Sequence, residues 1–138
     1  MLISIYREDQ FEAVRLLWES VFPDDPLRNR AERAIPAKLK IQPELFLVAH
    51  EHDEVLGTIM AGYDGHRGWL YAVAVKPDRQ GVGLGRMLVE EAESRLAAVG
   101  CGKVNLQVRS TNEAVIGFYR RLGYAVEERV SMGKRLAY

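Results

Sequence analysis

Apolar positions along the chain recur with two periods, one typical of helices and one of strands. Apolar and polar residues alternate over Leu2–Tyr6, which predicts a short strand. Residues 10–22 then carry apolar side chains at intervals of three and four, which predicts a helix. That stripe consists of Phe11, Val14, Leu17, Trp18 and Val21. A second, less regular helix is predicted over residues 29–40, where Pro36 would interrupt it because proline lacks a backbone donor.

From residue 45 the period changes to that of strands. Residues 45–51, 55–63 and 69–75 are apolar runs of strand length, separated by short polar or glycine-containing segments. Strands joined by turns this short pair in opposite directions. We therefore expect an antiparallel meander in the middle of the chain.

The second half of the chain alternates between helix and strand. A glycine-rich stretch after Pro77 opens an amphipathic helix that ends at Gly100. Its predicted apolar stripe is Leu84, Met87, Leu88, Ala92, Leu96 and Val99. A strand over 103–108, a helix over 112–122 and a closing strand or hairpin over 124–136 follow. The sequence thus predicts one α/β domain over residues 1–138, with a mixed, mostly antiparallel sheet flanked by helices.

Length and charge exclude several classes of protein. A chain of 138 residues with 48% hydrophobic residues suits one globular domain and is too apolar for disorder. Its 19 basic and 19 acidic residues give a formal net charge of zero, whereas a general nucleic-acid binder needs a basic excess. The single cysteine, Cys101, excludes an internal disulfide. No apolar run approaches the ~20 residues that span a membrane, and no signal-peptide pattern is present. We expect a cytoplasmic protein without nucleic-acid or membrane partners.

The most informative segment is the passage from the last meander strand into the following helix. Glycines at Gly81, Gly83 and Gly85 let the backbone turn tightly and approach a ligand. Successive N–H groups at a helix N-terminus bind phosphate or pyrophosphate, and Arg79 and Arg86 could add charge. The segment matches neither the dinucleotide fingerprint nor the nucleotide P-loop. A glycine-rich helix cap without a ligand is the alternative, and three glycines within five positions favour the ligand.

Two segments resemble the signatures of one family. Gln80-x-x-Gly83-x-Gly85, between an apolar strand and an amphipathic helix, resembles the coenzyme A pyrophosphate loop of the GNAT superfamily of N-acetyltransferases. A later segment resembles the family's second signature. In it, Asn112 is followed seven residues later by Tyr119 and then by a Gly-aromatic pair. The predicted element order resembles the family over essentially the whole chain. The resemblance therefore implies a GNAT-like fold.

The resemblance implies an acetyl-CoA-dependent N-acetyltransferase, in which an amine acceptor attacks the thioester directly. The implied cofactor-binding residues are Val73, Ala74 and Val75 along the pantetheine arm, Gln80, Gly81, Val82, Gly83, Leu84, Gly85 and Arg86 at the pyrophosphate, and Asn112. Tyr119 resembles the family's general acid. A phenol of pKa about 10 is protonated at neutral pH and can hydrogen-bond the developing thiolate, whose thiol has a pKa of about 8.5. Considered alone, Tyr119 also fits a buried helical stripe.

The group that accepts the amine proton is less defined. Family members often carry Glu or His at the start of the strand before the pyrophosphate loop, where this chain has Trp69 and Tyr71. The substitution suggests an aromatic-lined acceptor pocket. Asp64 and His66 in the preceding turn could act directly or through water, and with Tyr71 they complete the catalytic candidates. An ordinary polar turn is the alternative for Asp64 and His66.

Other features leave further possibilities open. His50 and His52 have strand spacing but no evident third ligand, so no metal site is predicted. Asp24 and Asp25 lie between the first two helices, where the family binds acceptors, and could attract a cationic amine. A sensor that binds acyl-CoA without turnover, and a phosphate-binding domain unrelated to coenzyme A, are the alternatives to an enzyme. Exposed edges in the last strands could support a homodimer.

Overall fold

The chain divides into two compact units, Met1–Leu106 and Gln107–Tyr138. The computed structural model describes residues 1–137, and in this part of the chain five strands form one sheet within the first unit. In their order across the sheet they are β1 (Leu2–Ile5), β2 (Phe46–Glu51), β3 (Glu54–Tyr63), β4 (Gly68–Val75) and β5 (Val104–Leu106). Neighbours from β1 to β4 pair antiparallel, and β5 pairs parallel with β4. The predicted mixed, mostly antiparallel sheet is confirmed.

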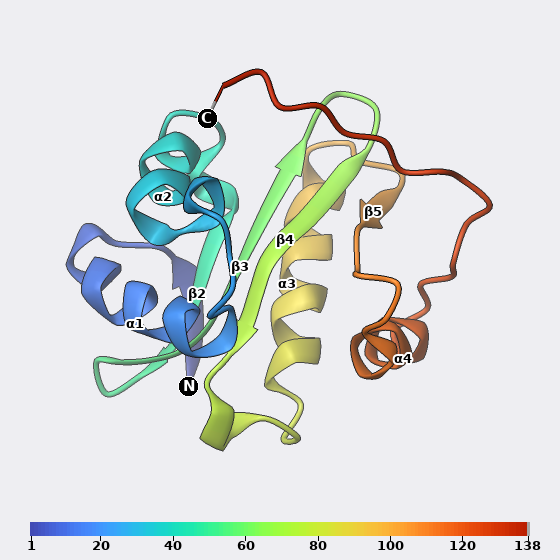
Figure 1. Cartoon of the computed structure of the whole chain (residues 1–138). Helices are drawn as coiled ribbons and strands as arrows, with labels where there is room; N and C mark the ends of the chain where they lie inside the picture. Colours follow the sequence, from blue (N-terminus) through green and yellow to red (C-terminus); the bar gives the residue numbers. More distant parts are fainter. Residues whose placement is uncertain (138) are drawn as a thin grey trace. The chain divides into compact units, whose positions relative to one another are not determined.

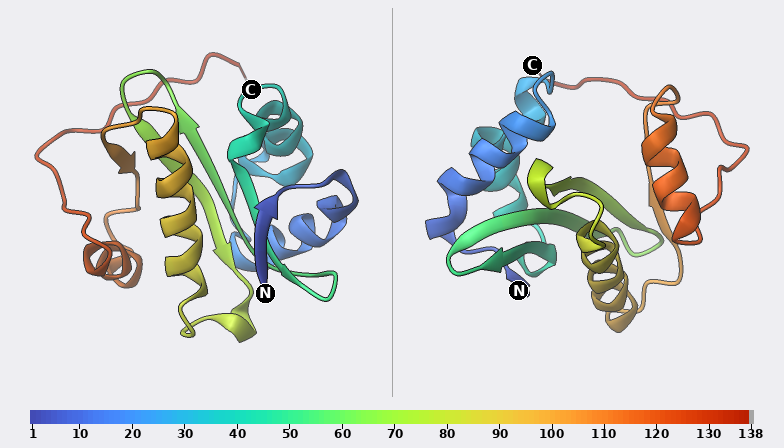
Figure 2. Two further views of the ribbon diagram at one scale, coloured as in Figure 1. Left: turned by 180° about the vertical axis from the view of Figure 1, so that it is seen from behind. Right: turned by 90° about the horizontal axis from the view of Figure 1, so that it is seen from below.

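Helices cover both faces of this sheet (Figure 1). α1 (Phe11–Val21) and α2 (Ala31–Leu39) lie on one face, and α3 (Leu84–Ala98) lies on the other, as the right-hand view of Figure 2 shows. β3 is therefore enclosed on both sides, and residues 55–61 are buried without interruption. None of the helices in residues 1–137 is both long and apolar enough to cross a membrane.

Two helices differ in detail from their predicted form. Met87 and Val99 in and beside α3 are 45% and 54% exposed, and Val89 is buried in their place. The stripe of α3 that is buried therefore differs from the one that the apolar pattern alone predicts. Pro36 lies inside α2 and does not interrupt it, at the expense of one backbone donor.

The second unit contains α4 (Glu113–Arg121), within the predicted range of 112–122. The predicted closing strand or hairpin over 124–136 is wrong, because residues 124–137 form no strand. The alternating side chains of this segment are at least 69% exposed, at Val126, Val130, Met132 and Leu136. Alternation produces a strand only where a neighbouring backbone supplies hydrogen-bond partners. The homodimer expected from the edges of the last strands stays a prediction.

Gly57 in β3 lies where a side chain has no room. A Cβ there would lie 2.8 Å from the Ala74 carbonyl oxygen in β4 and 2.9 Å from Leu88 Cδ1 in α3. We expect Gly57→Ala to lower the free energy of unfolding by about 1–3 kcal/mol, because strand and helix must move apart. Urea unfolding measures the change. Gly102→Ala is the control, since a Cβ at Gly102 meets nothing within 4 Å, and an equal effect of both substitutions would contradict the packing.

Candidate active site

The second half of β4 has an open backbone edge. β5 pairs with β4 only over residues 68–70, so within the first unit residues 71–75 have no strand partner on that side. The amide of Lys76 donates to β3 at 2.8 Å, and backbone groups alternate along a strand, so those of Val75 point to the open side. Gln80 Nε2 donates to the Val75 carbonyl there, at 3.1 Å. An edge of this kind can pair with an extended ligand as with another strand.

A bulge in β4 lies beside this open edge. Two residues of β4, Ala72 and Val73, lie opposite one residue of β3, Ile59. Ala72 has a φ of +50°, in the left-handed region that residues with a Cβ adopt rarely. A bulge bends its strand and redirects the neighbouring side chains. Here Tyr71 is left 45% exposed, whereas Ala74 is buried.

Two hydrogen bonds, one buried and one partly buried, connect the bulge to α1. Trp18 Nε1 donates to Thr58 Oγ1 at 2.9 Å, and the Thr58 hydroxyl donates to the Ala72 carbonyl oxygen at 2.9 Å. Thr58 is fully buried, so its hydroxyl needs partners of this kind. Thr58 is absent from the predicted site, although a hydroxyl side chain in the middle of an apolar strand was a signal that could have identified it.

The glycine turn after β4 has the backbone geometry of an anion-binding site. Gly81 and Gly83 have φ values of +83° and +89°, and a Cβ at either position would meet nothing within 4 Å. Gly83 is the N-cap of α3, and its carbonyl accepts the first helical hydrogen bond from the Met87 amide at 3.1 Å. The N–H groups of residues 84–86 precede that bond and have no partner along the helix. They point out of the positive end of α3, where a phosphate group is favoured.

Acidic neighbours hold both arginines beside the turn. The Arg79 guanidinium lies 3.7 Å from a carboxylate oxygen of Glu51 and 3.6 Å from one of Glu54. Arg86 Nε lies 3.3 Å from Glu90, one helical turn further along α3. Exposed ion pairs of this kind are weak, so a phosphate can exchange for either carboxylate.

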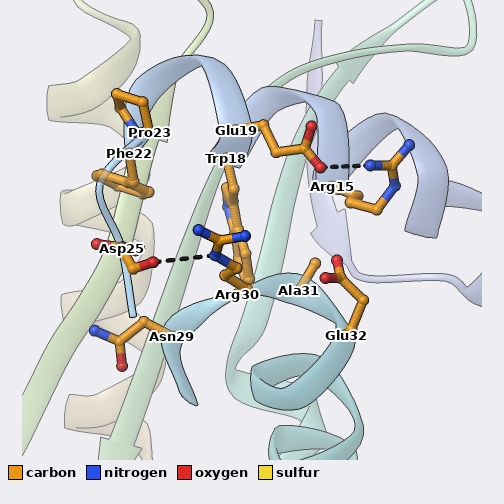
Figure 3. A pocket seen from close by; sticks show the side chains of 10 residues that line it. All are labelled: Arg15, Trp18, Glu19, Phe22, Pro23, Asp25, Asn29, Arg30, Ala31 and Glu32. Atoms are coloured by element: carbon orange, nitrogen blue, oxygen red, sulfur yellow. Dashed lines mark hydrogen bonds and ion pairs between the residues drawn. The ribbon is translucent and has the colours of Figure 1, made fainter. Parts of the chain in front are cut away.

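A cavity of about 370 Å³ lies between α1 and α2 (Figure 3). Its lining combines aromatic, acidic and basic side chains, and consists of Arg15, Trp18, Glu19, Phe22, Pro23, Asp25, Asn29, Arg30, Ala31 and Glu32. Arg15 forms an ion pair with Glu19, and Arg30 Nε donates to the backbone carbonyl of Asp25 at 3.0 Å. Of the two aspartates predicted on the acceptor side, Asp25 lines this cavity, and Asp24 is not part of its lining.

A buried lysine of α2 lies against the ring of Tyr71. Lys38 Nζ is 5.8 Å from the ring centroid and donates to the Ala61 carbonyl oxygen. Burial lowers the pKa of Lys38, and burial also raises the pKa of Tyr71, so the phenol is protonated at neutral pH and can donate a hydrogen bond. Lys38 was not predicted, although it shares the buried stripe of Ala31 and Ile35 at helical spacing.

Asp64 and His66 lie together in the exposed turn between β3 and β4. The Asp64 carboxylate accepts the backbone N–H groups of Arg67 at 2.7 Å and His66 at 2.8 Å, and Trp69 Nε1 at 3.3 Å. The hydrogen bonds from Arg67 and His66 lower the pKa of Asp64. This geometry shows a carboxylate that holds a turn. Its role as a base stays a prediction, as does that of His66.

The pKa of Asp64 predicts how the turn responds to acid. Because the folded pKa lies below the unfolded value of about 4, the contribution to stability is complete above that value and is lost as the pH falls through the folded pKa. We expect wild type to melt at a higher temperature than Asp64→Ala at neutral pH, with the difference vanishing in strong acid. Asp24→Ala, which removes an exposed carboxylate elsewhere, is the control. A difference that does not depend on pH would contradict the role of the charge.

The second predicted motif lies in the second unit. Asn112 is the N-cap of α4, and its Oδ1 accepts the Val115 amide at 3.3 Å. Tyr119 is 8% exposed, and its ring packs edge-on against Phe118 and Tyr124, with centroids 5.0 and 5.6 Å away. Burial raises the pKa of Tyr119 to about 12, so the phenol is protonated at neutral pH. Tyr119 therefore belongs to the buried side of α4 and also carries a proton that it can donate.

No three His, Cys, Asp or Glu side chains gather as a group that could hold a metal ion within residues 1–137. His50 and His52, the two histidines considered as metal ligands, lie in different environments. His50 Nε2 is 2.8 Å from Ser4 Oγ, and His52 lies in a turn with a φ of +50°.

Comparison with known proteins identifies several relatives. The profile of the acetyltransferase (GNAT) family matches residues 5–124. An acetyltransferase of Pectobacterium atrosepticum is 46% identical over 138 residues, which cover 99% of this chain and 96% of the relative. Among solved structures, an aminoglycoside N-acetyltransferase in complex with CoA superposes with a TM-score of 0.78 at 17% identity, covering 99% of this chain and 95% of that one. The ribosomal-protein-S18-alanine N-acetyltransferase from Escherichia coli gives 0.73 at 24% identity, with 88% and 76% covered.

Proposed function

Since the chain belongs to the GNAT family of acetyltransferases, we propose that it transfers the acetyl group of acetyl-CoA directly to a primary amine. The match of the family profile to residues 5–124 and the close relative carry the family membership and the general activity. The glycine turn at the N-terminus of α3 is the observation that supports the binding of acetyl-CoA by this chain's own residues. The acceptor and the roles of single residues belong to the proposal.

Two features of the first unit support the binding of acetyl-CoA, the glycine turn and the open edge of β4. The N–H groups of residues 84–86 suit the pyrophosphate, and Gly81 and Gly83 leave space around the turn. The backbone groups of Val73 and Val75 would pair with the amides of the pantetheine arm. β4 passes through residues 76–80 into the turn, so that the open edge and the anion site follow each other along one path.

The bound thioester supplies an activated acetyl carbon. The neutral amine forms a C–N bond to that carbon and the C–S bond breaks. The nitrogen loses one proton and the departing thiolate gains one, so that the products are an amide and coenzyme A with a free thiol. Tyr119 would donate a hydrogen bond to the thiolate, since its raised pKa keeps the phenol protonated at neutral pH. Because a thiol is ordinarily the stronger acid, hydrogen bonding to the sulfur is the main contribution we assign to the phenol.

The acceptor amine would approach from the cavity between α1 and α2. The lining carries three carboxylates, at Glu19, Asp25 and Glu32, against the two guanidiniums of Arg15 and Arg30. Its net negative charge would favour a cationic amine. The amine must lose a proton before attack. His66 and Asp64 are the candidates that would take that proton, and Tyr71, whose phenol is protonated, would position the amine. The two structural neighbours act on an aminoglycoside and on the alanine of a ribosomal protein, so the fold alone does not select between small and protein acceptors.

A thiol-release assay with purified protein, acetyl-CoA and a panel of amines tests this proposal. The panel includes peptides with free N-termini, lysine peptides, polyamines and aminoglycosides. We expect thiol release with at least one class, and mass spectrometry should show the acetylated amine. Binding of acetyl-CoA without release for any amine would favour the sensor. Thermal shifts that show no preference for acetyl-CoA over nucleotides would favour an unrelated phosphate-binding domain.

A further inference from the structure

A hydrogen-bond relay that begins in α1 reaches the bulge in β4. We propose that Thr58 and Trp18 are positioning residues, which hold Ala72 in its left-handed conformation and thereby set the edge of β4 that receives acetyl-CoA. This inference rests on the proposed function, because it assumes that the open edge of β4 binds acetyl-CoA. It adds two residues that lie outside both family signatures recognised in the sequence.

The direction of the relay follows from the chemistry of its members. An indole N–H can only donate, so Thr58 Oγ1 accepts from Trp18. The single hydroxyl proton of Thr58 is then available for the carbonyl oxygen of Ala72, 2.9 Å away. Thr58 is fully buried and Trp18 is 4% exposed, so the bond between them is shielded from water, and the bond to Ala72 is partly shielded. The hydrogen bonds of the relay are therefore complete only when the Ala72 carbonyl points toward β3.

The conformation of Ala72 is unfavourable without such support. An alanine at a φ of +50° brings its Cβ too close to the backbone, and β4 regains an ordinary extended conformation if nothing opposes it. Loss of the bulge would shift the pairing of the following residues with β3 by one position. Since backbone groups alternate, that shift would turn the edge-facing groups of Val73 and Val75 inward. The relay thus determines which groups the open edge presents.

Trp18 also connects the edge to the other candidate binding region. Its side chain lines the cavity between α1 and α2, as Figure 3 shows, while its indole nitrogen reaches Thr58. A ligand that enters this cavity contacts the same indole that supports the bulge. The two binding regions of the first unit therefore share one buried structural support.

Thr58→Val is the decisive variant, because valine keeps the shape of threonine and removes the hydroxyl. It leaves the Trp18 N–H and the Ala72 carbonyl without their partner. We expect the dissociation constant for acetyl-CoA, measured by titration calorimetry, to rise about tenfold. Thr58→Ser retains the hydroxyl and should restore an affinity close to that of the wild type. A role in packing alone predicts the reverse order, since serine loses the methyl group that valine keeps.

Ile35→Val is the stability control. Ile35 is buried in the same layer between the helices and the sheet, and its side chain has no polar atom. We expect this variant to lower the melting temperature and to leave the affinity for acetyl-CoA unchanged. Equal affinities of Thr58→Val and wild type, or an equal loss in Ile35→Val, would overturn the inference.

A second variant covers the case in which Thr58→Val does not fold. Trp18→Phe keeps an aromatic ring and removes the N–H that orients the Thr58 hydroxyl. A severalfold loss of acetyl-CoA affinity is expected, and an unchanged affinity would count against the relay. If the wild type itself fails to bind acetyl-CoA, the proposed function fails instead, so the two failures are distinguishable.

Discussion

Replacing Gly83 by glutamate is expected to weaken the binding of acetyl-CoA by about 100-fold or more. The new carboxylate would lie at the N-terminus of α3, where the site would otherwise receive the pyrophosphate, and like charges repel strongly at such short range. The left-handed φ of +89° adds backbone strain for any residue with a Cβ. Titration calorimetry with acetyl-CoA measures the loss of affinity.

Gly100→Glu is the matched control for this experiment. Gly100 follows α3 at its other end, has a φ of +94°, and would likewise accommodate a Cβ without a contact within 4 Å. The substitution therefore introduces the same charge and similar backbone strain outside the proposed cofactor site. We expect both variants to be less stable than the wild type, Gly100→Glu more so because its carboxylate lies at the negative end of α3, but a loss of affinity only in Gly83→Glu. Equal affinities of the two variants would contradict the assignment of the turn.

Replacing Tyr119 by phenylalanine is expected to lower kcat by about 100-fold, because a positioned proton donor typically contributes this much or more. The aromatic packing against Phe118 and Tyr124 does not involve the hydroxyl, so the fold should be retained. KM for acetyl-CoA should change little, since the hydrogen bond to sulfur strengthens only as charge develops on it. Steady-state kinetics with the best acceptor from the amine panel separates the two parameters.

Tyr124→Phe serves as the control, because it removes a hydroxyl from the same aromatic cluster. A large loss of kcat confined to Tyr119→Phe supports a role in the reaction. An unchanged kcat in Tyr119→Phe at saturating substrates would remove Tyr119 from that role. Similar losses in both variants would indicate that the cluster acts through its packing.

Part of the structure of this protein was predictable from its sequence, because it follows from local physical constraints. Helical and strand periods predicted α1 to α4 and β1 to β5, because amphipathic patterning is set by residues near each other in the chain. The glycines of the turn were predictable in the same way, since the positive φ values of Gly81 and Gly83 are costly for other residues. The role of Tyr119 was predicted from its spacing from Asn112 within a recognisable motif, and it stays a prediction.

Contacts between distant segments decided the rest. The bulge at Ala72 depends on Thr58 and Trp18, which lie 14 and 54 positions away in the chain, and no local period reveals a hydrogen bond across that separation. The contact of Lys38 with Tyr71 is non-local for the same reason.

The segment 124–136 shows the opposite error, since its alternation suggested a strand and only a neighbouring backbone can make one. The sequence by itself therefore determined the family, the order of the elements up to α4 and the conformation of the glycine turn, all of which depend on short-range patterns. The tertiary structure alone decided where β4 bulges, which of its backbone groups stay open and which side chains line the cavity. These features arise from pairing and packing between residues that the chain brings together only on folding.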